Sequence, residues 1–392
     1  MSFAAGRPFL AIPGPSPLPD RVARAMHRPA PDIYGDQMLE LGQGLFPDLK
    51  RLAGTSANLA AYIGNGHAGW EAANVNMLRA GDRALVLSSG HFGNSWAASA
   101  RALGVDVEVM EFTGGKPADP ARLSARLQQP DAGGIRAILT TQVDTATSVR
   151  NDIPALRAAI DAAGHQALFA VDAIASLGCE PLLMDEWGID VLVGASQKGL
   201  MMAPGLAFVW FSDRARAAAR LAPPYWAWQP RADAVEGWQF WGGTAPVQHM
   251  FGLREALDML LEDEGLPAAY ARHEGLAQAL WAAVDAWGSG GDIAALVDDP
   301  NARARSVTAI RIGGGRATPL REWLDSRCAL VLGIGLGAAD PASALRVAHM
   351  GHVSAHQMLG TIACMDAGMT ALQIPHGSGA TEAAAKVIAR LA

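Results

Sequence analysis

Cysteine, aromatic residues and charged residues are all scarce in this chain of 392 residues. Its only cysteines are Cys179, Cys328 and Cys364, and an odd, widely spaced set predicts neither a disulfide framework nor a cysteine-based zinc site. Only 18% of the residues are charged and the formal net charge is −7, which argues against nucleic acid and anionic membranes as partners, since both require basic patches. We therefore expect a protein of a reducing compartment, the cytoplasm.

Long apolar runs are also missing. The N-terminal residues lack a basic segment followed by an apolar stretch, and no run of about 18 apolar residues occurs, so neither a secretory signal nor a membrane-spanning helix is predicted. Hydrophobic residues are nevertheless abundant, at 50% of the chain, and they are spread along it in short runs. That fraction permits a large buried core, and the length predicts two or three domains at about 150 residues each.

Short apolar runs alternate with amphipathic helical segments from about residue 57 to residue 215. The runs at 84–88, 137–141, 167–172 and 191–194 are apolar at nearly every position, which is typical of strands covered on both faces. Alternation of strands and helices predicts an α/β fold with a mainly parallel sheet and right-handed crossovers.

Changes in composition divide the chain. Residues 1–19 are rich in proline and are predicted to be extended, because proline excludes a helix there. Residues 20–260 form the predicted large domain and 261–392 a smaller C-terminal α/β domain. Within the first, 216–245 is aromatic and without a clear period, as in long functional loops; residues 246–287 are predicted to be one long helical region.

The strongest chemical signal is a lysine and an aspartate that each follow a predicted strand. One apolar strand ends in Asp172, and the next runs into Gln197 and Lys198; ligands of parallel sheets bind outside such carboxyl ends. This pair suits pyridoxal phosphate (PLP), because the amine forms a Schiff base with the aldehyde and the carboxylate pairs with the pyridinium nitrogen. From spacing alone, a helix-capping Asp172 and a solvated Lys198 fit equally well.

Two glycine-containing turns add weaker signals. In GNGHAGWEAA (64–73), Asn65, Gly66 and His67 precede a helix, and free N–H groups at a helix start bind phosphate. The acidic residue expected about 20 positions after a dinucleotide-binding turn is not evident. In SSGHFGNSW (88–96), Phe92 is placed to stack on a flat ring, although an ordinary core position is equally consistent with the pattern.

Taken together, these motifs resemble the class V, fold type I PLP-dependent aminotransferases of the alanine–glyoxylate and serine–glyoxylate group. The resemblance extends from PGPSPLPDRVARAM (13–26) to LRVAHMGHVSAHQMLG (345–360), and DEWGIDVLVGASQKGLM (185–201) is its most specific part. It implies a large domain with a mainly parallel sheet of seven strands, a smaller C-terminal α/β domain, PLP as the cofactor, and a homodimer with shared active sites.

The resemblance also implies roles around the cofactor ring. Lys198 matches the Schiff-base lysine and Asp172 the partner of the pyridinium nitrogen. Phe92 matches the stacking aromatic, and Ile174 the residue against the other face of the ring. Thr145 matches a hydroxyl residue near the phenol oxygen.

Further implied roles concern the phosphate and the substrate. Gln197 and the turn at 65–67 match phosphate ligands, and Thr244 matches a phosphate contact donated by the second subunit. Arg346 matches the arginine that binds the substrate carboxylate, for which a guanidinium fork is suited. Gly14, in the first motif, is placed with the substrate-binding residues.

Four positions depart from the pattern of this group. Asn65 stands where serine is usual, and Asp144 replaces a more usual glutamate. Trp241 replaces a tyrosine and cannot accept a hydrogen bond. Tyr34, in Ile33-Tyr34-Gly35, stands where a His-Arg-Ser segment faces the substrate, which leaves the amino-acid specificity open.

The resulting prediction is ping-pong transamination from L-serine or L-alanine to glyoxylate. Alternatives on the same scaffold are a transaminase for ureidoglycine or pyridoxamine and a PLP-dependent β-lyase or desulfurase. A silent PLP-binding protein is disfavoured because Lys198, Asp172 and Arg346 are all present. A nicotinamide-dependent dehydrogenase fits the alternation alone but not the lysine motif.

No metal is predicted. His349, His352 and His356 have ligand-like spacing, but the segment passes from a predicted strand through a glycine into a helix, so the three side chains need not share a face.

Overall fold

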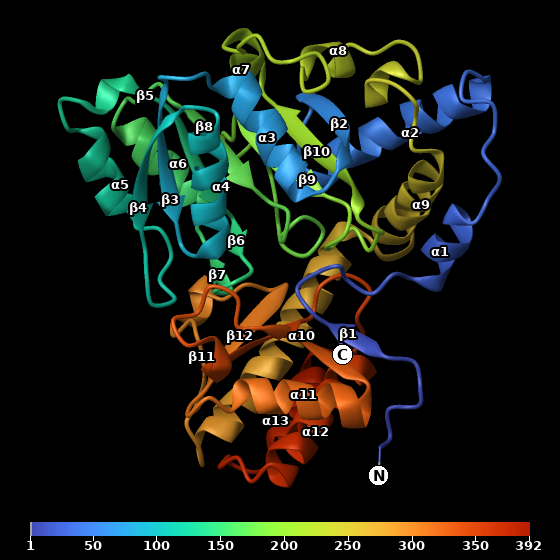
Figure 1. The fold of residues 1–392 in the computed structure, drawn as a ribbon, viewed down its shortest axis with the longest axis vertical. Helices are drawn as coiled ribbons and strands as arrows, with labels where there is room; N and C mark the ends of the chain where they lie inside the picture. The colour runs from blue at the N-terminus through green and yellow to red at the C-terminus, as the bar shows by residue number, and fades with distance from the viewer. Residues whose placement is uncertain (1) are drawn as a thin grey trace.

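The computed structural model of the chain describes residues 2–392, and it contains a large sheet and a smaller sheet in two halves of the molecule (Figure 1). The large sheet has seven strands in the order β2-β10-β9-β8-β5-β3-β4. Six of the strands run in the same direction and β10 runs in the opposite one, as predicted for a mainly parallel sheet. The strands are β2 (Asn58–Gly64), β3 (Arg83–Ser88), β4 (Asp106–Glu111), β5 (Ile135–Thr141), β8 (Leu168–Asp172), β9 (Val191–Ala195) and β10 (Gly205–Phe211).

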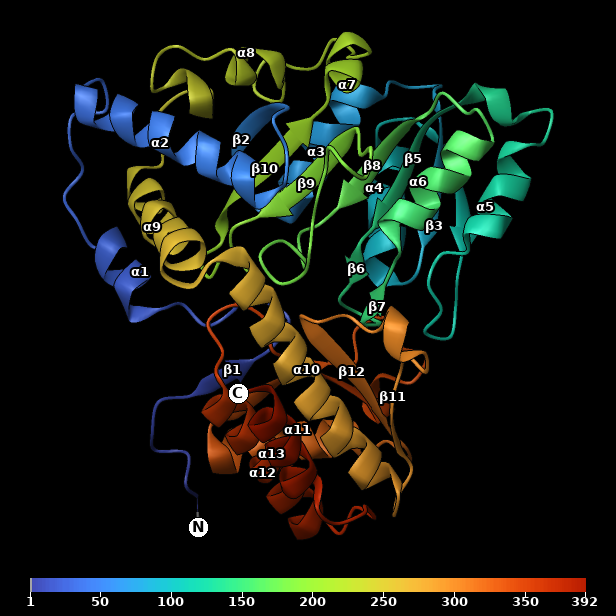
Figure 2. The ribbon, with the colours of Figure 1, turned by 180° about the vertical axis from the view of Figure 1, so that it is seen from behind.

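Helices cover both faces of this sheet, which explains why its central strands are apolar throughout (Figures 1 and 2). Alternate residues of β3 point to opposite faces: Val86 packs with the cluster of α3 and α4, and Leu85 with the cluster of α2, α5, α6 and α9. The helices are α2 (Asp36–Leu52), α3 (Gly66–Met77), α4 (His91–Ala102), α5 (Pro120–Leu127), α6 (Ile153–Ala162) and α9 (Val247–Leu257).

Local sequence fixes the ends of α6. The Asp152 side chain accepts a hydrogen bond from the Ala155 N–H at 3.0 Å, which satisfies one of the free donors of the first turn. Pro154 lies in that turn, where it loses no hydrogen bond. Gly164, at φ 63°, follows the helix in the left-handed conformation that ends helices.

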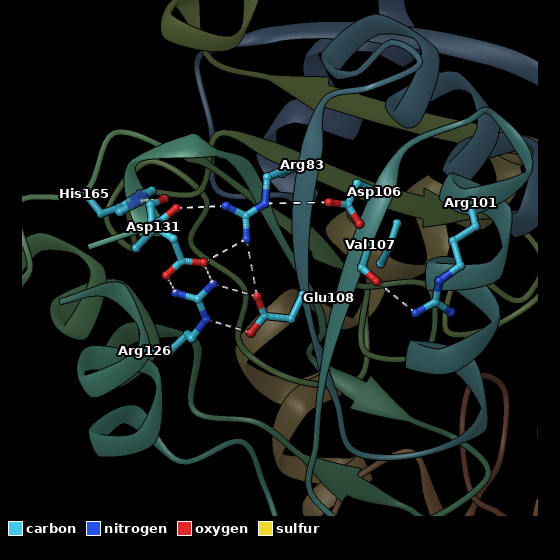
Figure 3. A network of polar contacts seen from close by, with 9 residues as sticks. Arg83, Arg101, Asp106, Val107, Glu108, Arg126, Asp131 and His165 are labelled. Carbon is cyan, nitrogen blue, oxygen red and sulfur yellow. Dashed lines mark hydrogen bonds and ion pairs between the residues drawn. The ribbon is translucent and has the colours of Figure 1, made fainter. Parts of the chain in front are cut away.

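The outer edge of the large sheet, strand β4, is covered by charged side chains (Figure 3). Arg126 binds both carboxylate oxygens of Glu108, at 2.7 and 2.8 Å, and Asp131 at 2.9 Å. Arg101 donates a 3.0 Å hydrogen bond to the Val107 carbonyl oxygen. Such charges occupy the edge of a sheet and oppose pairing with another chain.

The smaller sheet has five strands in the order β1-β13-β14-β12-β11. Its first strand comes from the N-terminal segment and pairs in parallel with β13, so the predicted extended segment is part of the same half as the C-terminal residues. The strands are β1 (Phe9–Ala11), β11 (Ile293–Ala295), β12 (Val307–Ile312), β13 (Leu330–Ile334) and β14 (Ala344–Ala348).

Four helices form one core with the small sheet: α10 (Leu266–Gly288), α11 (Ala317–Cys328), α12 (Ala355–Ala371) and α13 (Ala380–Leu391). In β14, Leu345 and Val347 belong to that core. Because side chains alternate along a strand, Arg346 between them points to the opposite face. Helix α13 has no counterpart among the predicted elements.

The predicted long helix over 246–287 is wrong in one respect, because it is interrupted. A π-helical segment, Asp258–Glu264, follows α9, and Gly265 (φ 78°) separates it from α10. Pro267 lies in the first turn of α10, where the helix cannot be continuous with the preceding turn because proline clashes with it and lacks an N–H. Within residues 2–392, no helix has both the length and the apolar composition needed to cross a bilayer.

Candidate active site

A cavity of about 180 Å³ lies where strands β8 and β9 end and helices α3 and α4 begin. The cavity is lined by every residue that the sequence analysis assigned to the cofactor ring or to its phosphate from the same chain. Thr244, which was assigned to the second subunit, does not line it. Four larger hollows lie elsewhere, and none of them is lined by Lys198 or Asp172. The cavity is lined by Asn65, Gly66, His67, Trp70, Phe92, Val143, Thr145, Asp172, Ile174, Ala175, Gln197 and Lys198.

Asp172 is the last residue of β8 and is 4% exposed. Its Oδ1 accepts the Ile174 N–H at 2.7 Å, and its Oδ2 accepts the indole N–H of Trp70 at 3.1 Å. Burial raises the pKa of Asp172 to about 7, against the opposing effect of these two hydrogen bonds. The carboxylate is therefore held in a fixed orientation by donors on both of its oxygens.

Trp70 is a site residue that sequence reasoning missed, although it lies within the quoted GNGHAGWEAA motif. It is three residues after His67 on α3, so both side chains lie on one face of the helix, and their rings meet edge to face at 4.7 Å. Trp70 also stacks on Trp96 of α4, with ring centroids 5.9 Å apart. The available signal was this helical spacing.

Lys198 follows β9 and is fixed at both ends by the N-terminal segment. Its Nζ donates a hydrogen bond to the Pro13 carbonyl oxygen. At its backbone, the Ser16 hydroxyl donates to the Lys198 carbonyl oxygen at 2.7 Å. A side chain at Gly14 would overlap the Lys198 side chain, so Gly14 lies directly beside Lys198. Burial and the positive charge of Arg346 lower the pKa of Lys198 to about 8.

The turn at the start of α3 offers backbone donors to the cavity. Asn65 precedes the helix, and its side chain accepts the His67 N–H at 3.1 Å. Gly66 packs so closely on Ile174 that a Cβ would overlap it. Opposite, Gln197 Oε1 is buried without a hydrogen-bond partner among residues 2–392. The free N–H groups of a helix start favour an anionic ligand group here, whereas the Gln197 Oε1 is an acceptor and needs a donor.

Arg346 lies beside the cavity and is linked to it through Thr145. It is 7% exposed. Its Nη1 donates to the Thr145 carbonyl oxygen at 3.0 Å and its Nε to the Ile334 carbonyl oxygen at 2.7 Å. Burial lowers the pKa of Arg346 to about 10, so the side chain stays cationic at neutral pH.

Two predicted residues are not brought to this cavity within one chain. Thr244 is exposed and follows Gly242 and Gly243 in the loop before α9. Tyr34, before α2, is 78% exposed. Trp241 is buried, and its Nε1 has no hydrogen-bond partner among residues 2–392.

The three clustered histidines do not meet. His349 is buried and bonds the Thr308 hydroxyl at 3.0 Å and the Arg305 carbonyl oxygen at 2.8 Å. His352 and His356 line a different hollow, beside the N-terminal segment. In the part of the chain that the structure describes, no group of three His, Cys, Asp or Glu side chains is arranged to hold a metal ion.

The chain is similar to known proteins over most of its length. The model of the class-V aminotransferase family matches residues 56–358. The chain is 35% identical to a serine–glyoxylate aminotransferase of Methylorubrum extorquens, over 96% of this chain and 95% of that protein. It is 34% identical to an L-aspartate–glyoxylate aminotransferase of Paracoccus denitrificans, over 96% and 94%.

Among solved structures, the pyridoxamine–pyruvate aminotransferase of Mesorhizobium loti matches with a TM-score of 0.90. That match has 23% identity and covers 100% of each chain. At this identity the likeness concerns the fold.

Proposed function

This chain belongs to the class-V aminotransferase family, and on that premise we propose that it transfers the amino group of L-serine or L-alanine to glyoxylate by ping-pong transamination. The observation that carries the proposal is the presence of Lys198 and Asp172 in one buried cavity. Glyoxylate is favoured as the acceptor because it appears in the names of both relatives above.

PLP is the cofactor of this family, and the residues of the cavity fit it. Lys198 is placed to hold it covalently, and Asp172 to face the ring nitrogen. The start of α3 can donate N–H groups to the phosphate, and the side-chain NH2 of Gln197, which lines the same cavity, can donate to it as well. Phe92 and Ile174 both line the cavity, where they can contact the ring. Bound PLP supplies a pyridine ring that accepts electrons from the substrate Cα.

Each residue then has a task in the transfer. Lys198, with its lowered pKa, would take the proton from the substrate Cα and deliver it to the C4′ carbon of bound PLP. Asp172, when ionised, keeps the ring nitrogen protonated. Arg346 binds the substrate carboxylate with two parallel N–H groups and so orients the Cα toward Lys198.

We also propose the finer points that the sequence suggested. The enzyme is a homodimer in which Thr244 of each chain contacts the phosphate in the other, which is supported by its exposure outside its own cavity. Tyr34 faces the substrate of the assembled site. Residues 1–19, 20–260 and 261–392 are the N-terminal segment, the large domain and the small domain. A cytoplasmic location is supported by free thiols at all three cysteines.

The test is the visible absorbance of the purified protein during addition of single amino acids. We expect bound PLP to give a visible band that L-serine or L-alanine bleaches and glyoxylate restores. Lys198→Ala should lose the band and turnover together. Arg346→Ala should keep PLP but bind the donor weakly. Loss of PLP from Arg346→Ala without loss of donor affinity would contradict the role of Arg346.

The same experiment separates the alternatives. L-aspartate is included as a donor because the second relative is named for it. Ureidoglycine and pyridoxamine are added as donors to test the two alternative transaminase activities. Release of sulfide or alanine from cysteine identifies a lyase or desulfurase. A stable band that no donor bleaches rejects the proposed substrates, and the lack of a band after PLP is added rejects the cofactor assignment.

A further inference from the structure

Helix α4 receives its N-terminal cap from a different part of the chain. The residue before it, Gly90, has no side chain and makes no cap hydrogen bond. Instead, Oδ2 of Asp144 accepts the Phe92 N–H at 2.8 Å and the Gly93 N–H at 3.2 Å. Those are the donors that a capping side chain normally satisfies. Phe92, the proposed stacking residue, is thus held by its own backbone.

The fit between Asp144 and Gly90 is close. Asp144 is fully buried. A Cβ at Gly90 would lie 2.7 Å from the Asp144 Cγ and 2.8 Å from the Thr147 Cγ2, both below the separation that real side chains show. The lack of a side chain at position 90 therefore leaves the space that the Asp144 carboxylate occupies.

The other carboxylate oxygen fixes the turn that carries Thr145. Oδ1 of Asp144 accepts the Ala146 N–H at 2.9 Å, and the Asp144 carbonyl oxygen accepts the Ser148 N–H at 2.8 Å. Thr145 lines the cavity from this turn, and its carbonyl oxygen accepts the 3.0 Å hydrogen bond from Arg346. One carboxylate therefore contacts the backbone on both sides of the site.

Charge supports the same connection. The negative charge of Asp144 favours the protonated form of Arg346 and so raises the pKa of that guanidinium against the effect of burial. Burial raises the pKa of Asp144 itself, while its three N–H donors and the positive charge of His91 lower it. The N-terminus of a helix also favours an anion at this place.

We propose that Asp144 is a positioning residue, whose carboxylate sets the place of Phe92 over the cofactor ring and, through Thr145, the orientation of Arg346 toward the substrate carboxylate. The inference rests on the proposed function, since the roles of Phe92 and Arg346 belong to it. A purely structural helix cap is the competing explanation, and it predicts an effect on stability alone.

Asp152 offers a matched control, because it caps α6 in the same way through the Ala155 N–H and does not line the cavity. The variants Asp144→Asn and Asp152→Asn are compared by three measurements: the melting temperature, the dissociation constant for PLP added to the apoprotein, and that for glycolate added to the PLP-bound protein. Glycolate carries the carboxylate of glyoxylate but has a hydroxyl group in place of the aldehyde, so it reports on binding without turnover.

Asp144→Asn is expected to weaken PLP and glycolate binding by about tenfold each, because an amide cannot accept hydrogen bonds at both of its ends. Asp152→Asn should lower the melting temperature and leave both constants unchanged.

Gly90→Ala provides an independent perturbation, because it displaces the Asp144 carboxylate without removing its charge. It should weaken both ligands in the same direction, and it keeps the test decisive if Asp144→Asn does not fold. Wild-type constants in either folded variant overturn the positioning role and leave the proposed function intact. A wild-type chain that does not bind PLP overturns the proposed function, and the positioning role falls with it.

Discussion

Burial acts in opposite directions on the two central groups of the site. It raises the pKa of Asp172 to about 7 and contributes most to lowering that of Lys198 to about 8, because burial penalises whichever form is charged. Each pKa is therefore shifted toward neutral pH. For an amine that must act both as a nucleophile toward PLP and as a base toward the substrate, such a pKa is suited to the task.

The pKa of Lys198 predicts the pH dependence of cofactor attachment. Only the neutral amine attacks the PLP aldehyde, so the rate should fall as the pH decreases below about 8 and level off above it. The measurement is the rate at which apoprotein mixed with PLP develops the visible band, recorded across the neutral and alkaline range. N-acetyl-lysine amide is the control, with a midpoint near that of free lysine, about 10.4. The same midpoint in the protein would contradict the lowered pKa.

Trp70 provides a second prediction for a single residue. Trp70→Phe removes the donor to Asp172 Oδ2 and keeps an aromatic ring. The pKa of Asp172 should rise further, since a hydrogen bond that favours its ionised form is lost. We expect turnover to fall about tenfold, from the loss of one hydrogen bond to a charged group, while PLP stays bound.

Trp96→Phe is the matched control for Trp70→Phe. Trp96 stacks on Trp70, but its indole donates to Asn74 rather than to Asp172. Equal loss of turnover in the two variants would show that packing, and not the hydrogen bond to Asp172, accounts for the effect.

At the scale of elements, the sequence was sufficient where local patterns decide the structure. The central strands are apolar because both faces are covered, and α6 carries its own cap at Asp152. Features set by distant contacts were not predictable. Helix α4 is such a case, because it is capped from Asp144, which is remote in sequence. The break at Gly265, in contrast, had a local signal in Gly265 and Pro267 that the prediction of one long helix did not use. In the site, Lys198 could be placed from its position after a strand, whereas the hydrogen bond from Trp70 to Asp172 joins α3 to β8.

The contact between helix α10 and the segment after β14 predicts acid sensitivity. His273 Nδ1 lies 2.6 Å from the Ala269 carbonyl oxygen, and Nε2 accepts the Gly351 N–H at 3.0 Å, so this ring is neutral. Burial lowers the pKa of His273 to about 3 and that of His349 to about 4. Between an unfolded pKa of about 6.5 and these values, the unfolded state binds more protons, and stability falls as the pH falls.

The expected loss is up to about 1.4 kcal/mol per pH unit for each histidine inside that window, measured by urea unfolding at several pH values. Below about pH 3 both states are protonated and these groups contribute no further loss. His273→Gln should reduce the slope of the unfolding free energy against pH by roughly the contribution of one histidine. An unchanged slope in that variant would rule out His273 as a source.

At the scale of the whole molecule, the two sheets lie in separate halves (Figures 1 and 2), and residues tied to both halves meet at the candidate site. Arg346 comes from the small sheet and binds the Thr145 carbonyl oxygen, on the segment that follows β5 of the large sheet. The N-terminal segment leaves the small sheet after β1 and reaches Lys198 through Pro13 and Ser16. A movement of one half relative to the other would therefore change the contacts of both Lys198 and Arg346.

The proposed exchange of Thr244 between subunits predicts complementation between two defective chains. Lys198→Ala alone has no covalent PLP, and Thr244→Ala alone should bind PLP weakly because a phosphate contact is lost. In a mixed dimer, the site with the intact Lys198 would receive Thr244 from the Lys198→Ala chain and would be fully wild type. Random reassembly of equal amounts should then give about a quarter of all sites with wild-type affinity, measured as the visible band at limiting PLP. If Thr244 served its own chain instead, no mixed dimer would contain an intact site, and the band would not exceed the average of the two separate proteins.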